Sequence, residues 1–534
     1  MILTKPYRSA RQLIPNDQKP VTIAYIFICI CASLDNYNIG ATLTALPSIT
    51  KKLQVESTIA TWAVSAYALT LASFIILAGK AGDIFGHEHV FIISSFLSGF
   101  FSLLSAVIPN SIIAVIVMRA MQGVFGAALI PCSFALAGNY FTGVKLQKAI
   151  VSLILGLTSM MGVSLLIGGA FGVSKIGYKG VFYLNFAMSW LCALVLLVIC
   201  PDIPRTEAHK SLDVKKLDFP GCAGLISGLL LVILGLTEGG SSWRQAKAYV
   251  PLVVGAVLLV GVICYEMVYI QSFKDKYEGV EEHQNDWRVT TQLLFPREVL
   301  KISNFIPYAA GSFLCYLGFA SLFAMMVEYY QYITLDSSVM IGLKTMAYSM
   351  GLFCGAVIYR EWWAIKVGKK NLIVASALLQ LTMAVWLSRL DFTVKHSYWK
   401  YECFSMFLMG LGCNMYFNVF FVELIAGSPL HLQGVVTGIV QTGSQIGVAL
   451  GNALIATILG DLELTRDVQT RVEMSKRFQH GFYLLFASTG LTVIVLLFTK
   501  PKRSTLEEDE TVDELKKEEE GVVETKELAN SCSE

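Results

Sequence analysis

Charge is scarce in this chain of 534 residues. Only 15% of the residues are charged, whereas a typical soluble domain carries about 25%. Hydrophobic residues make up 55%, and the mean hydropathy is +0.60. A single soluble core stops growing near ~250–300 residues, so an apolar excess of this size would have no soluble interior to fill. The composition therefore argues against a soluble enzyme and against a disordered scaffold.

The usual marks of soluble chemistry are also missing. No two cysteines form a Cys-x-x-Cys pair, and no Cys/His cluster has the spacing of a zinc site. The chain has no Walker motif and no nucleophile elbow, which speaks against ATP-driven transport and against hydrolysis. The basic segments lack interleaved aromatic residues, so we expect no nucleic-acid partner. We predict no enzyme activity, no cofactor and no metal site.

The chain does contain a series of apolar stretches of roughly 18–25 residues, the length that crosses a bilayer as a helix. We place fourteen of them, at 21–46, 59–78, 89–108, 111–132, 149–173, 181–200, 219–237, 249–270, 305–331, 338–358, 371–388, 402–425, 434–459 and 482–499. Isolated strands would leave their edges unpaired in lipid. The prediction is an all-α membrane protein whose partner is the lipid bilayer.

Lysine and arginine are unevenly distributed among the predicted loops. With a cytoplasmic N-terminus, 23 of them fall in inside segments and 13 in outside loops, so we expect both termini in the cytoplasm. The basic segment 1–20 precedes an apolar run that is too long for a signal peptide, and we interpret this run as a retained first span. The segment 507–534 holds 12 acidic and 3 basic residues, which predicts a disordered tail.

Two charged residues lie well inside predicted spans. A charge in a span costs several kcal/mol unless it is paired or hydrated, so such a residue is a functional candidate. Asp35 in the first span and Arg119 in the fourth both lie roughly 12–14 Å below the outer boundary, a depth that permits a carboxylate–guanidinium pair. We expect Asp35 to bind a proton or a cationic substrate and Arg119 to be its partner. The alternative is a static pair that holds two helices together.

Polar residues inside other spans are weaker candidates. Glu328 and Lys344 lie toward the outer ends of the ninth and tenth spans and could reach an outer vestibule, although a solvated interfacial pair explains them as well. Amides that face lipid are costly, so amide-bearing faces should line a cavity or a helix contact. The substrate-cavity candidates with amide side chains are Asn36, Asn38, Asn414, Asn418, Gln441, Gln445 and Asn452.

One loop has a more specific pattern. Between the second and third spans runs Gly79-Lys-Ala-Gly82-Asp83-Ile-Phe-Gly86-His87, which resembles the Gly-x-x-x-Asp-x-x-Gly loop of the major facilitator superfamily. The fourth span reads Arg119-Ala-Met-Gln122-Gly123, similar to the Arg-x-x-Gln-Gly motif of drug:proton antiporters. Asp35 through Pro47 looks like the first-span signature of the fourteen-helix subfamily. The string Gly-Asp-Ile-Phe-Gly-His looks most like a fungal branch that contains aminotriazole-resistance proteins, boron exporters and low-affinity ammonium transporters.

The resemblance implies a major facilitator fold of two six-helix bundles with two additional spans. It assigns proton coupling to Asp35 and Arg119. It also implies a conformational-switch role for Gly79, Asp83, Gly86, Gln122 and Gly123. In terms of residues we expect a cytoplasmic segment 1–20, bundles at 21–200 and 305–499, linker spans with a cytoplasmic loop at 201–304, and the tail 500–534.

The chain also departs from the family pattern. Ile84, His87 and Glu88 stand where basic residues are common in the loop. The antiporter motif Gly-Pro-x-x-Gly-Gly of the fifth span is here Ser164-Leu-Leu-Ile-Gly168-Gly169, without the Gly-Pro pair. These differences weaken the case for drug/proton exchange specifically and leave the transporter prediction intact.

The preferred function is proton-coupled export of a small molecule or xenobiotic, with protons and the small-molecule substrate as partners and the protein a monomer. One alternative is uptake or uniport of a small ion or solute such as ammonium or borate. Another is a membrane receptor that no longer transports. We expect a location in the fungal plasma membrane, with the vacuolar membrane as the alternative.

Overall fold

A computed structural model describes residues 7, 11–55, 57–108, 111–203, 218–240, 242–277, 286–291, 293–360, 364, 366–391, 394, 396–429, 432–460, 462, 465 and 467–500. Within these residues, fourteen helical segments are long and apolar enough to cross a membrane, which confirms the predicted number. The described chain contains no strand, and the all-α prediction is correct.

The spans have the following bounds: α2 Val21–Leu53, α3 Ser57–Phe85, α4 His87–Val107, α5 Ile112–Gly126 continued by α6 Leu129–Tyr140, α7 Gly143–Val173, α8 Lys179–Ile199, α10 Phe219–Gly239, α11 Ala246–Cys264, α15 Phe305–Glu328, α16 Ser338–Ile358, α18 Lys369–Leu387, α19 Cys403–Ala426, α20 Gln433–Leu459 and α21 Val468–Leu497. Shorter elements are the 3-10 turn η1 Asn16–Gln18, the π-helical turns η3 Tyr265–Ile270, η5 Tyr329–Ile333 and η6 Tyr398–Glu402, and the helices α12 Gln271–Tyr277, α13 Trp287–Thr290 and α14 Glu298–Lys301. All backbone polar groups in lipid need internal partners, so long apolar runs fold as helices.

Local sequence explains where some of these helices break or begin. The fourth span is interrupted after Gly126 because Pro131 has no N–H to donate to the carbonyl of Ala127, four residues earlier. The last span begins fourteen residues before the predicted start of 482. Asp467 caps it there, since its carboxylate accepts a hydrogen bond from the backbone N–H of Thr470 at 2.9 Å.

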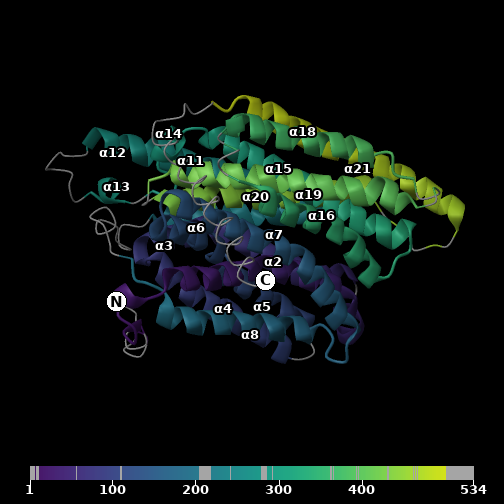
Figure 1. Ribbon diagram of the computed structural model, residues 1–534, viewed down its shortest axis with the longest axis horizontal. Helices are drawn as coiled ribbons and strands as arrows, with labels where there is room; N and C mark the ends of the chain where they lie inside the picture. The colour runs from purple at the N-terminus through teal and green to yellow at the C-terminus, as the bar shows by residue number, and fades with distance from the viewer. Residues whose placement is uncertain are drawn as a thin grey trace, which may run out of the picture.

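The helices lie along the long axis of the molecule in two neighbouring groups (Figure 1). In the first group α2 packs on α7, and α4 packs on α5 and α8. In the second group α15 packs on α20, while α19 packs on α16 and α18. The groups meet along α3–α20 and α7–α16, and the pair α10–α11 contacts both groups through α10. The functional candidates in α2 and α5 therefore lie in one group, and those in α19 and α20 lie in the other.

We call the end of the bundle that carries Gly86, between α3 and α4, the motif end. The two groups touch closely there. The rings of Phe134 in α6 and Phe421 in α19 stack with centroids 4.4 Å apart. A Cβ on Gly138 in α6 would collide with the side chain of Gln433, the first residue of α20. The structure is thus closed between the groups at the motif end.

The polar segments beside the spans are only partly described. The N-terminal segment is held to the motif end, where the Arg11 guanidinium forms an ion pair with Asp202 and donates to the carbonyl of Cys200 at 3.0 Å. The predicted disordered tail 507–534 lies outside the described residues.

Candidate functional site

Arg119 is the centre of a buried polar network between α2, α3 and α5. Its Nε donates to the carbonyl of Ala63 at 2.9 Å, and its Nη2 donates to the carbonyl of Asn38 at 3.1 Å. Its Nη1 reaches the side-chain oxygens of Asn38 at 3.3 Å and Gln122 at 2.8 Å. The guanidinium is fully buried. A buried charge must be hydrogen-bonded, and here neutral oxygen atoms from three helices accept the hydrogen bonds of the guanidinium.

Asp35 does not pair directly with Arg119. The carboxylate, 1% exposed, accepts a hydrogen bond of 2.6 Å from the hydroxyl of Tyr67 in α3. The Arg119 guanidinium carbon lies 4.4 Å from the centre of the same tyrosine ring. The structure therefore brings the two predicted residues together through an aromatic ring, with a cation–π contact on one side and a charge-assisted hydrogen bond on the other.

The two asparagines that follow Asp35 have different roles in packing. Asn36 donates to the carbonyl of Leu157 in α7 at 2.6 Å. Asn38 accepts from Arg119 and, at 3.0 Å, from Gln122 Nε2, while its own amide donates to Asn185 of α8 at 3.2 Å. Asn38 thus belongs to the arginine network, and Asn36 fixes the contact between α2 and α7.

The second group of helices approaches Asp35 through α15 and α20. Tyr316 of α15 lies within electrostatic reach of Asp35 and within hydrogen-bonding reach of Gln441 in α20. Gln441 and Gln445 are both buried, whereas Asn452 on the same helix is exposed. Gln441 and Gln445 therefore form the buried part of this amide face, and Asn452 does not belong to it.

Asn414 and Asn418 form a pair on one face of α19. Asn418 Nδ2 donates to Asn414 Oδ1 at 2.6 Å, and both side chains are fully buried. The remaining amide groups, Asn414 Nδ2 and Asn418 Oδ1, find no hydrogen-bond partner within the described part of the chain. Unsatisfied buried polar groups are costly and call for an explanation. A polar substrate group would be a fitting partner for them.

The predicted loop motif lies where α3 meets α20. Gly86 has a φ of +98°, a backbone conformation that favours glycine. Asp83 Oδ1 lies 3.1 Å from His87 Nε2, and both side chains are buried. A Cβ on Gly434 of α20 would lie 2.8 Å from Asp83 Oδ1 and 2.8 Å from the carbonyl of Gly79. The Asp83–His87 pair therefore touches the start of α20 directly.

Gly123 permits close packing of α5 on α3. A Cβ at this position would overlap the side chain of Thr70 and the backbone of Tyr67. Thr70 closes the contact by donating to the carbonyl of Ala120 at 2.7 Å. Of the Gln-Gly pair, Gln122 therefore belongs to the arginine network, and Gly123 lets α5 pack close to Tyr67.

The altered motif of the fifth span leaves α7 as one continuous helix. The residue at the proline position of the antiporter motif is Leu165, which keeps its backbone N–H for the helix. Ser164 faces Gly40, and Gly168 faces Ala41, so small residues let α7 approach α2 closely. The sequence of this span thus favours tight packing on the helix that carries Asp35.

Glu328 and Lys344 do not form a pair in the structure. The ammonium of Lys344 lies 2.5 Å from Asp336 Oδ2, in the loop between η5 and α16. Glu328 is partly buried near the end of α15 and forms no ion pair among the described residues. Asp336 is closer in sequence to Lys344 than Glu328 is. Its position in the loop before α16 lets its carboxylate reach Lys344 in the first turns of that helix.

Sequence reasoning missed several residues of these networks. Tyr67 and Asn185 carry no charge, and an uncharged polar side chain inside a span does not stand out in the sequence. Glu266 in η3 was passed over because the predicted eighth span was chosen for its apolar character. This carboxylate is fully buried and accepts hydrogen bonds from the backbone N–H groups of Leu294 and Phe295 at 3.0 and 2.8 Å.

One group of metal-ligating side chains occurs among the described residues, at the motif end. Potential ligand atoms of Glu88, His89 and Asp202 lie within 4.8 Å of one another. Asp202 is already paired with Arg11, and Lys19 lies 3.7 Å away. Two adjacent cations disfavour a third, so we assign no metal to this cluster.

Comparison with known proteins agrees with this geometry. The sequence profile of the Major Facilitator Superfamily matches residues 26–278 and 308–529. The puromycin resistance protein pur8 of Streptomyces alboniger is 26% identical over 78% of this chain and 77% of its own. The aminotriazole resistance protein of Saccharomyces cerevisiae is 23% identical over 81% of this chain and 76% of its own. The solved structure of the proton:xylose symporter XylE superimposes with a TM-score of 0.60 at 13% identity, covering 93% of this chain and 98% of its own. The chain belongs to the Major Facilitator Superfamily of membrane transporters.

Proposed function

We propose that this transporter exports a small molecule or xenobiotic in exchange for protons, and that Asp35 is the proton-binding carboxyl. The observation that supports this proposal is the arrangement of Asp35, Tyr67 and Arg119. The carboxylate is buried with a neutral hydroxyl as its hydrogen-bond donor, while four neutral oxygens hold the arginine. Uptake of a proton by Asp35 would therefore break no ion pair.

Proton binding would be sensitive to conformation because both helix groups surround the carboxyl. Asp35, Tyr67 and Arg119 belong to the first group, and Tyr316 belongs to the second. When the groups rock apart on one side, water replaces the second group near Asp35 and favours its charged form. When they close, burial favours the neutral form. Substrate in the same interface would then compete with the proton, as alternating access requires.

The loop motif would set which side is open. In the present structure α3 and α20 are joined at Gly79 and Gly434, with the Asp83–His87 pair against the same turn. We propose that this contact forms when the motif end is closed and separates when it opens.

The resemblance also implies bundles at 21–200 and 305–499, a monomeric protein, cytoplasmic termini and a plasma-membrane location. All of these remain part of the proposal.

The names of the relatives guide the choice of substrate for a first test. One is a puromycin resistance protein and another an aminotriazole resistance protein. Cells of a drug-sensitive yeast strain that express the full chain should survive higher concentrations of puromycin, aminotriazole or both than cells with an empty vector. Asp35→Asn should remove this advantage at equal expression. The control Asp17→Asn changes an exposed carboxylate outside the spans and should leave resistance unchanged.

A vesicle assay distinguishes the mechanisms. In inside-out vesicles with an acidic interior, addition of an exported drug should release protons through wild-type protein and not through Asp35→Asn. Drug flux that is equal in both proteins at every pH would refute a coupling role for Asp35. Movement of ammonium or borate without proton exchange would support uniport instead. If none of these compounds moves, the receptor alternative gains support.

A further inference from the structure

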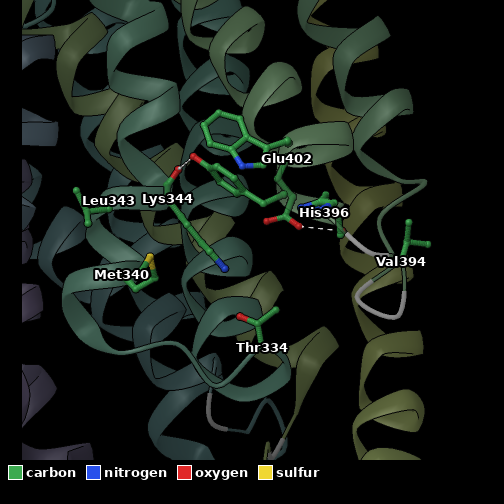
Figure 2. A pocket seen from close by; sticks show the side chains of 10 residues that line it. Thr334, Met340, Leu343, Lys344, Val394, His396 and Glu402 are labelled. Atoms are coloured by element: carbon green, nitrogen blue, oxygen red, sulfur yellow. Dashed lines mark hydrogen bonds between the residues drawn. The ribbon is translucent and has the colours of Figure 1, made fainter.

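A cavity of about 570 Å³ lies at the end of the second helix group opposite the motif end. It is lined by the residue that follows η5, the beginning of α16 and the segment that leads into α19 (Figure 2). Its lining residues are Thr334, Met340, Leu343, Lys344, Val394, His396, Ser397, Tyr398, Trp399 and Glu402. The π-helical turns η5 and η6 lie on two sides of it, and such turns often occur at functional sites. The volume is in the range of small-molecule sites.

The positive charge in this cavity is already neutralised. Lys344 forms an ion pair of 2.5 Å with Asp336, and Asp336 also accepts from the hydroxyl of Thr334. The ammonium lies over the rings of Tyr330 and Tyr398, at 4.9 and 5.7 Å from their centres. Lys344 and Glu402 extend into the same space from different helices, but no ion pair joins these two residues (Figure 2).

Glu402 forms no ion pair among the described residues, although the ammonium of Lys344 and the hydroxyl of Tyr330 lie within electrostatic reach of its carboxylate. The side chain is 2% exposed, and Oε1 accepts a hydrogen bond of 3.1 Å from the hydroxyl of Ser397. The second oxygen, Oε2, is buried and accepts no hydrogen bond from the described part of the chain. The neighbouring Tyr330 directs its hydroxyl toward Met406 Sδ at 3.8 Å. A buried carboxylate oxygen without a partner is unfavourable, and a cation in the cavity would satisfy it.

We propose that this cavity is a second ligand site that binds an organic ammonium ion, with Glu402 as the counter-charge and Trp399 as an aromatic wall. Trp399 lines the cavity and is 70% exposed as a residue. Aromatic faces attract ammonium groups. A divalent metal is a poorer fit because it requires several oxygen ligands, and Asp336 is occupied by Lys344.

This site is separate from Asp35 and does not depend on proton coupling. Asp35 is buried between α2 and α3 in the first helix group, whereas the cavity is built from elements of the second group only. Binding can therefore be measured directly, without a transport assay, and failure of one proposal leaves the other standing.

The test is equilibrium dialysis of purified full-length protein in detergent against radiolabelled benzylammonium, whose N–H groups can donate to Glu402 Oε2. We expect saturable binding of one ion per chain. Glu402→Gln should weaken binding about tenfold or more, as loss of a charge partner implies. Asp35→Asn should bind as the wild type does. The matched control Glu238→Gln removes a carboxylate that pairs with Lys247 outside the cavity, and it should also bind normally.

The aromatic wall gives a second set of variants that does not disturb the buried charge. Trp399→Ala should weaken binding about two- to fivefold, and Trp399→Phe should restore most of it. The proposal is overturned if wild-type protein does not bind benzylammonium, or if Glu402→Gln, shown to be folded by its melting temperature, binds as tightly as wild type. Saturable binding of benzoate in place of benzylammonium would overturn it as well, since Lys344 would then be the anchor.

Discussion

The contact between Gly79 and Gly434 offers a direct test of how the motif end closes. These two glycines bring the backbones of α3 and α20 together, and a Cβ on Gly79 would lie 2.5 Å from the carbonyl oxygen of Gly434. Cβ atoms are not found this close to an oxygen, and the obstacle is backbone rather than a flexible side chain. Gly79→Ala should therefore force α3 and α20 apart at this end.

The size of the effect follows from the cost of overpacking. Inserting one methyl group into a close-packed contact costs about 1–3 kcal/mol. Only the conformation in which the helices touch bears this cost, so the population ratio should shift by a factor of about 5 to 150 toward the conformation that is open at the motif end. The helix-propensity gain of alanine over glycine, about 1 kcal/mol, is the same in both conformations and cancels.

Cross-linking reports this shift. In a background without native cysteines, Phe134→Cys and Phe421→Cys place one thiol on each of the facing helices α6 and α19, whose rings now stack with centroids 4.4 Å apart. A short bifunctional thiol reagent should cross-link this pair rapidly in otherwise unchanged protein and at least several-fold more slowly with Gly79→Ala. The control is Gly443→Ala, in the same helix α20, where an added Cβ meets nothing within 4 Å. This control should cross-link at the original rate.

Two results would refute this reasoning. If Gly79→Ala cross-links as fast as the control, the two groups tolerate a methyl group between α3 and α20, and the contact does not govern closure. If Gly443→Ala slows the reaction equally, the effect comes from α20 as a whole and not from the glycine contact.

Two further predictions concern regions outside the central site. Glu266→Gln should lower the free energy of unfolding by about 1–3 kcal/mol, because the carboxylate holds the backbone N–H groups of Leu294 and Phe295 in a buried position. A melting assay with a thiol-reactive dye should show a lower melting temperature for this variant. The control Glu298→Gln, at the exposed start of α14, should leave the melting temperature unchanged. Burial raises the pKa of Tyr7 to about 12, so its phenol stays mainly protonated at pH 11, where an ordinary tyrosine is about 90% ionised. Because the folded-state pKa lies above the unfolded value, the stabilisation by Tyr7 is complete below pH 10 and is lost as pH rises toward 12. The absorbance difference at 295 nm between wild type and Tyr7→Phe should be small at pH 11, and a full tyrosinate signal there would contradict this.

The transmembrane architecture could be predicted because lipid imposes a strong rule on sequence. Every span must be long, apolar and helical, and the predicted spans match the observed ones apart from their ends. The ends depend on local caps such as Asp467, whose effect extends α21 fourteen residues into a polar region. A hydropathy pattern contains no information on such a cap, so helix ends were the weakest part of the prediction.

The candidate site was predictable in its charges and not in its connections. The rarity of charge in lipid points to Asp35 and Arg119, and equal depth in the membrane places them near each other. Depth does not reveal that Tyr67 lies between them, because a tyrosine fits a span without cost. The same limit applies to Lys344, whose partner Asp336 is in a loop, and to Glu402, which is the first residue of the predicted span 402–425.

Helix α3 connects the proposed proton site to the proposed switch. Tyr67, which donates to Asp35, and Ala63, whose carbonyl holds Arg119, lie on this helix. Gly79, which meets α20, lies twelve residues after Tyr67 on the same unbroken helix, about 18 Å away from it. A helix of this length moves as a rod, so separation at Gly79 must also shift Tyr67 relative to the second helix group. Asp35 and Tyr67 would move together with the first group, so the proposed opening at Gly79 would replace the second group beside Asp35 with water and favour the charged carboxylate. This is how a change in conformation would be converted into a change in proton binding.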